Sequence, residues 1–174
     1  MRRFTGVLIA CAAGLVLVGT AIAGFNANKS VHLSGDLEVP ANSSAGQGQA
    51  SFHLSEDGTS VEYTLNVANI ENVVVAHIHL GLPGANGPVG VFLYPSSTAG
   101  SSVPPGGGRI DGRIVEGSFT AANFIGPFAG MTVEQVWALI ENGGAYVNVH
   151  TNDGVAPGGT GPGDLPGGEI RGDF

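Results

Sequence analysis

Cysteine is almost absent from this chain of 174 residues, and the single one, Cys11, lies within the first 23 residues. Those residues have the pattern of a secretory signal peptide: Arg2 and Arg3, then an apolar run, then Ala21-Ile22-Ala23 as a cleavage pattern. We predict that residues 1–23 are removed. An uncleaved membrane anchor is the alternative, because the apolar run is about long enough to span a bilayer. The remaining domain can form no disulfide, so its core or a metal ion must stabilise it.

Basic residues are scarce as well. Beyond the leader, four of them stand against 14 acidic residues, which gives a net charge of −10. Nucleic acids and anionic membrane surfaces both require a basic patch on the protein that binds them. The composition therefore excludes both as partners, and a membrane contact is expected only through the N-terminal segment if it stays uncleaved. The four basic residues are Lys29, Arg109, Arg113 and Arg171.

Motifs of several enzyme classes are also missing. The sequence contains no nucleophile elbow, no H-E-x-x-H zinc motif, no phosphate-binding glycine loop and no dinucleotide fingerprint. Glycine itself is abundant, with 30 residues, but most of these glycines separate segments of alternating polarity. That placement is typical of turns in an all-β protein.

Alternation of apolar and polar residues predicts about eight short strands. Together with turn signals between them, these strands predict a single all-β domain, a Greek-key-like sandwich or a flattened barrel. The expected strands cover 31–37, 49–55, 61–67, 73–80, 89–94, 109–119 (as one or two strands), 146–151 and 168–174.

One short helix is expected near residues 132–142. Thr132 can cap its first turn with Gln135 as the capping-box partner, and Val133, Val136, Trp137 and Ile140 recur at helical spacing. Gly143 suits the end of the helix. We predict that this helix covers one end of the β-core.

Three histidines carry the clearest chemical signal. His77 and His79 lie two residues apart on a predicted strand, so they share one face while Ala76 and Ile78 face the core. By the same alternation, His150 points outward from a later strand. If the two strands lie together, three imidazoles converge on the outside of the core. Imidazole nitrogens bind copper, zinc and nickel, and His32 or His53 could add a fourth ligand.

Four separated segments make the chain similar to a known family, the CHRD domain of chordin and of secreted bacterial proteins. They are LSGDLEVP (33–40), AHIHLGLPGANGPVGVFL (76–93), YVNVHT (146–151) and GGEIRGDF (167–174). The resemblance extends over residues 30–174. It implies an exported β-sandwich-like domain located in the periplasm, on the cell surface or outside the cell. It implies no particular biochemical activity.

A second resemblance concerns the copper–zinc superoxide dismutases. Those enzymes also have an H-x-H pair on one strand, a third copper histidine on a later strand, and then a glycine-rich loop and an arginine. Here the order is His77, His79, His150, residues 154–168 and Arg171. However, the loop at 81–90 contains no histidine, aspartate or glutamate, and the disulfide cysteines of that family are missing. The resemblance implies a copper-like site without a zinc partner.

Three hypotheses for the function follow from these features. The first is a non-enzymatic module that binds a metal, copper before zinc, through His77, His79 and His150. The second is a superoxide dismutase-like copper enzyme in which Arg171 steers an anion to the metal by its charge. The third is a structural or adhesive surface module in which the histidines brace loops. For Arg171, a salt bridge or an anchor for a loop is the other interpretation.

Overall fold

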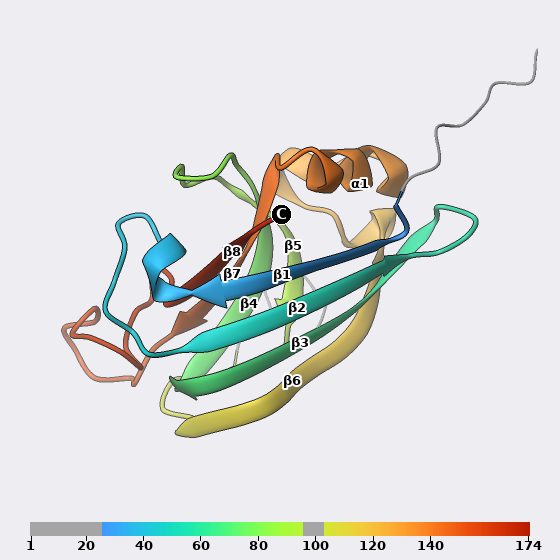
Figure 1. Cartoon of the computed structure of the whole chain (residues 1–174). Coiled ribbons are helices and arrows are strands. Elements are labelled where there is room, and N and C mark those ends of the chain that lie inside the picture. Colours follow the sequence, from blue (N-terminus) through green and yellow to red (C-terminus); the bar gives the residue numbers. More distant parts are fainter. Residues whose placement is uncertain (1–25, 96–102) are drawn as a thin grey trace, which may run out of the picture.

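The chain folds into eight β-strands and one α-helix within the residues that the structure, a computed structural model, describes: 26–95 and 103–174 (Figure 1). The predicted leader at residues 1–23 lies outside these ranges. The strands are β1 (Asn28–Ser34), β2 (Gln47–Leu54), β3 (Ser60–Glu71), β4 (Val73–Leu80), β5 (Val89–Tyr94), β6 (Arg109–Thr120), β7 (Ala145–Thr151) and β8 (Ile170–Asp173). No helix in the described residues has the length and apolar character needed to cross a membrane.

All eight strands form a single antiparallel sheet in the order β5-β4-β7-β8-β1-β2-β3-β6. The sheet curls into a flattened barrel that is nearly closed, which confirms the second of the two predicted architectures (Figure 1). Tyr63 on β3 helps to close it: its hydroxyl donates a hydrogen bond of 2.8 Å to the carbonyl oxygen of Leu93 on β5, a strand with which β3 does not pair.

The core fills the inside of this barrel with the apolar side chains that the alternation predicted. Leu33, Leu65, Ile78, Val91 and Val147 are all completely buried there. Burying one such side chain contributes roughly 1.5–3 kcal/mol, so the core can hold the domain together without a disulfide.

Helix α1 (Val133–Glu141) begins where the sequence predicts. The backbone N–H of Gln135 donates to Thr132 Oγ1, and the Thr132 N–H donates to Gln135 Oε1, which completes the capping box. Trp137 is fully buried against the core, and its ring N–H donates to the carbonyl oxygen of Asn26. The helix lies over one end of the barrel (Figure 1).

Some predicted strand boundaries need correction. The first strand ends at Ser34 rather than at residue 37, because residues 35–37 form a 3₁₀ turn. Gly35 permits this turn: a Cβ there would lie 2.4 Å from Asn42 Oδ1, and the Asn42 N–H donates to the Gly35 carbonyl oxygen. The last strand begins only at Ile170 rather than at residue 168. Of the two possibilities for residues 109–119, the structure has the single strand, with a bulge.

Connecting segments cover the outer face of β4, β7 and β8. Arg171 on β8 donates to the carbonyl oxygen of Leu82, and Asn86 from the same loop donates to the carbonyl oxygen of Val39. These contacts hold the loop after β4 and the turn after β1 against the strands. Seven side chains between the strands and these segments form what we call the polar layer: Glu38, His77, His79, Tyr146, Asn148, His150 and Arg171.

Candidate metal centre

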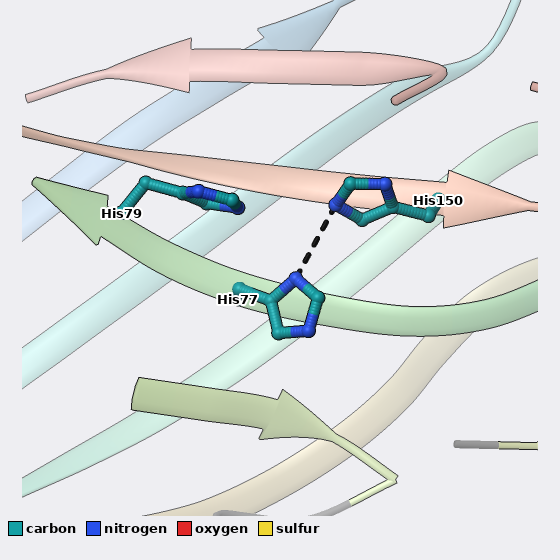
Figure 2. Close-up of side chains that lie close together, drawn as sticks. All are labelled: His77, His79 and His150. Atoms are coloured by element: carbon teal, nitrogen blue, oxygen red, sulfur yellow. Dashed lines mark hydrogen bonds between the residues drawn. The ribbon is translucent and has the colours of Figure 1, made fainter. Parts of the chain in front are cut away.

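The sheet order explains how the histidines meet. Strand β7 pairs with β4 although the two are far apart in sequence, and Val75 lies opposite His150 while His77 lies opposite Asn148. His77 and His79 project from β4 toward His150 on β7 (Figure 2). One ligand nitrogen from each ring lies within 4.8 Å of the other two. The predicted convergence of the three imidazoles is therefore present in the structure.

The histidines are not on the open surface, which corrects part of the prediction. Alternation placed them correctly on the face opposite Ala76 and Ile78, but His77 and His79 are each only 7% exposed and His150 is half-buried. The physical reason is the cover that the connecting segments provide. His150 is left as the most exposed of the three side chains.

Backbone carbonyl groups fix the orientation of two of the rings. Nδ1 of His79 lies 2.9 Å from the carbonyl oxygen of Gly87, and Nδ1 of His150 lies 3.0 Å from that of Pro166. A carbonyl oxygen only accepts hydrogen bonds, so each Nδ1 carries the hydrogen and each Nε2 presents a lone pair. Such an outer contact is the usual support of a metal-binding histidine. Consistent with this, His79 Nε2 is buried without any hydrogen-bond partner.

The third ring approaches the lone pair of His150. Nδ1 of His77 lies 3.3 Å from Nε2 of His150 (Figure 2). Two nitrogens that bind one ion at ~2.1 Å in a tetrahedral arrangement lie ~3.4 Å apart. This pair thus already has the spacing of two ligands. Without an ion, His77 Nδ1 carries a hydrogen and donates it to His150 Nε2.

Electrostatics keep the three rings neutral. Burial, together with the smaller effects of the neighbouring His150 and His79, lowers the pKa of His77 from the ordinary 6.5 to about 3. Burial also lowers the pKa of His79 to about 4, against the opposing effect of its bond to Gly87. Burial lowers the pKa of His150 in the same direction. Neutral imidazole is the metal-binding form, so no proton has to leave these rings at neutral pH.

Aromatic neighbours restrict the movement of the rings. Tyr146 stacks on His79 with ring centres 4.7 Å apart and planes inclined by 9°, and Phe92 meets His77 edge-on at 4.4 Å. Tyr146 was not predicted as part of the site, because its residue type favours the core. The alternation along β7 could have revealed it, because Tyr146, Asn148 and His150 necessarily share one face.

Arg171 is completely buried beside this site and has no N–H group to spare. Its guanidinium lies 3.6 Å from the ring centre of Tyr146. Nε and one terminal nitrogen contact Asp173 Oδ1 at 2.8 Å, and the other donor positions bind the Leu82 carbonyl, the Ala85 carbonyl and the Asn86 side chain. These contacts make Arg171 an anchor for the 81–88 loop. The charge of Arg171 is, after burial, one of the smaller causes that lower the pKa of His79. Anion steering by Arg171 stays a prediction.

His32 and His53 do not complete the ligand set. Both are exposed on the open side of β1 and β2, and His53 contacts Asn28 there. Within residues 26–95 and 103–174, the cluster of possible metal ligands consists of His77, His79 and His150 alone.

Comparison with known proteins agrees with the first resemblance. Residues 29–160 match the CHRD domain, a range that contains β1 except for its first residue, β2 to β7 and all three histidines. No curated protein and no solved structure matches the chain. The match covers well over half of the sequence and, with the all-β fold, it shows that the chain belongs to the CHRD domain family.

Proposed function

We propose that this CHRD-domain protein is a metal-binding module that holds one copper ion through His77, His79 and His150. The observation that carries the proposal is the convergence of three neutral imidazoles whose ligand nitrogens lie within 4.8 Å of one another. The carbonyl groups behind His79 and His150 support it, because they aim both Nε2 lone pairs away from the backbone.

The choice of copper follows from the ligand set. Imidazole suits copper, zinc and nickel, and copper(II) binds most tightly of these divalent ions at a given nitrogen site. A nitrogen pair at the 4.8 Å limit has to close by about 1.4 Å to reach the ~3.4 Å spacing of two ligands of one ion. His150 is the most exposed of the three histidines, so an ion can enter from its side. Zinc remains the competing ion in this proposal.

Isothermal titration with Cu²⁺ tests the proposal on the purified metal-free protein. We expect one saturable site per chain. Changing any one of the three histidines to alanine should weaken binding by more than ~100-fold, since even outer contacts of metal ligands contribute 10- to 100-fold. His53→Ala is the matched control, because His53 is an exposed strand histidine outside the cluster. Absence of saturable uptake, or equal losses in His53→Ala, would leave the histidines as braces between loops.

We also propose that the protein is exported. The leader pattern at residues 1–23 and the membership of the CHRD family support this location. N-terminal sequencing of the protein recovered from the periplasm or the medium should begin at Gly24. A protein that stays in the cytoplasm with its leader intact contradicts the proposal.

A further inference from the structure

The polar layer contains a carboxyl group that the metal site does not use. Glu38 is only 6% exposed; its Oε2 accepts a hydrogen bond of 3.3 Å from Asn148 Nδ2, while its Oε1 has no partner. Asn148 Oδ1 has no partner either. Buried polar atoms without partners are rare and costly, and two acceptors in one place need a donor.

The two unpartnered oxygens, Glu38 Oε1 and Asn148 Oδ1, both lie close to Gly168. A Cβ on this residue would lie 2.7 Å from Asn148 Oδ1 and 2.8 Å from Glu38 Oε1. The backbone thus closes directly over the pair. A single proton on Glu38 would provide the missing donor, because a neutral carboxyl group can donate through one oxygen and accept through the other. Paired in this way with the side-chain amide of Asn148, it leaves neither oxygen without a partner.

We propose that Glu38 carries a proton in the metal-free protein, donates it to Asn148 Oδ1, and releases it when an ion binds to the three histidines. The coupling rests on the proposed function. Metal binding and proton release are coupled because the ion brings positive charge into the covered polar layer. A buried charge without a counter-charge is unstable, and ionised Glu38 supplies that counter-charge.

The charged groups around the layer leave Glu38 as the acid that can respond. Arg171 already faces Asp173 on β8. Glu169, in the segment before β8, accepts hydrogen bonds from Ser44, Thr151 and the backbone of Gly163. The imidazoles on β4 and β7 enter the layer uncharged.

Position and acidity both suit this role. Asn148, the partner of Glu38, lies directly opposite His77 in the β4–β7 pairing, so one strand pair separates the proton from the ion. Burial raises the pKa of Glu38 from the ordinary 4.5 to about 7, and the bond from Asn148 and the charge of Arg171 only partly oppose that rise. A positive ion nearby lowers the pKa again, which releases the proton.

Proton release during metal uptake tests the coupling. At a pH of about 6, addition of Zn²⁺ or Cu²⁺ to the weakly buffered wild-type protein should release close to one proton per ion. Glu38→Gln should release none and bind the ion more weakly, because glutamine reproduces the hydrogen bonds of a neutral carboxyl group but cannot supply the counter-charge. Glu62→Gln, at an exposed glutamate on β3, is the control and should behave like the wild type. A proton from metal-bound water would appear equally in all three proteins.

Infrared spectroscopy of the metal-free protein tests the protonation itself. The C=O stretch of a neutral carboxylic acid should be present at a pH of about 6, disappear on metal addition, and be missing from Glu38→Gln but not from Glu62→Gln. Equal proton release from wild type and Glu38→Gln, or an identical band in both, overturns the proposal. If the wild type takes up no metal at all, the proposed function and the coupling fail together, whereas normal uptake without the expected difference overturns the coupling alone.

Discussion

The outer surface of the barrel has two halves that obey the same sequence pattern and end in opposite environments. On β1, β2 and β3, the outward residues such as Ser51, His53 and Glu62 stay in water. On β4, β7 and β8, the outward residues such as His79, Asn148 and Arg171 are buried under connecting segments. Strand alternation therefore decides which way a side chain points, and the loops decide whether it meets solvent. The candidate site lies in the half where outward-pointing polar side chains are also covered by loops.

The largest expected difference between the two halves concerns their arginines. Arg171→Ala should lower the free energy of unfolding by about 3–5 kcal/mol, because it removes a completely buried guanidinium and leaves the partly buried Asp173 and two backbone carbonyl groups without their donor. Arg109→Ala, which removes an exposed ion pair with Asp111, should cost less than about 1 kcal/mol. Urea denaturation of both variants measures the difference.

Arg171→Lys extends this test in case the alanine variant does not fold. Lysine keeps the charge but cannot fill all the donor positions, so its stability should lie between that of the wild type and that of Arg171→Ala. Equal stabilities of the Arg109 and Arg171 variants would show that losing an arginine costs no more unfolding free energy in the covered half than in the open one.

Glycine positions provide the second contrast. Gly168 has a φ of 131° and lies against Glu38 and Asn148, so Gly168→Ala combines backbone strain with a steric clash. We expect a loss of about 2–3 kcal/mol in unfolding free energy. Gly107 is exposed, and a Cβ added there would have no neighbour within 4 Å, so Gly107→Ala should change stability by no more than ~0.5 kcal/mol. Thermal unfolding measures both variants. Equal melting temperatures would contradict the close packing of Gly168 against Glu38 and Asn148.

The pH dependence of stability provides the third contrast. His77 has a pKa of about 3 when folded and an ordinary value of 6.5, so below pH 6.5 the unfolded chain takes up a proton that the folded chain does not. The stability contribution of neutral His77 is therefore complete above pH 6.5 and is lost as the pH falls. Between pH ~7.5 and pH ~5 the loss is about 2 kcal/mol for one such histidine.

His77→Gln should remove this pH-dependent loss of unfolding free energy, and His53→Gln should retain it. Urea denaturation of the metal-free proteins at both pH values gives the change in unfolding free energy for the wild type and for each variant. The contribution of His77 is the wild-type change minus the change in His77→Gln. Glu38 acts in the opposite sense, because its folded pKa is raised to about 7 and its contribution is lost as the pH rises. This effect is common to the wild type and to both histidine variants, so it cancels. An equal pH dependence in wild type and His77→Gln would contradict the neutral state of the buried ring.

Local pattern predicted most of the fold because the pattern and the packing agree. The capping box at Thr132, the alternation through β2 and β3, and the phase of the H-x-H pair all concern neighbours along the chain. The early end of β1 was missed because it depends on Asn42 packing against Gly35, a contact between side chain and backbone in a loop.

The three histidines of the candidate site could be predicted from the sequence, but their surroundings could not. Two histidines on one strand and one on another give the same signal whether or not loops cover them. Glu38 lies in a turn with no periodicity, and its importance comes from the approach of Gly168, which is 130 positions later in the printed sequence. Tyr146 has a residue type that favours the core, although its strand phase indicates the outer face.

The pairing of β4 with β7 also fixes an order of events. His77 and His150 are separated by 73 positions, and β7 has to insert between β4 and β8 before their rings can meet. A partly synthesised or still extended polypeptide offers at most two of the three imidazoles. Under the proposed function, metallation is a late step that reports completion of the barrel, and a translocating chain would acquire its copper only at its destination.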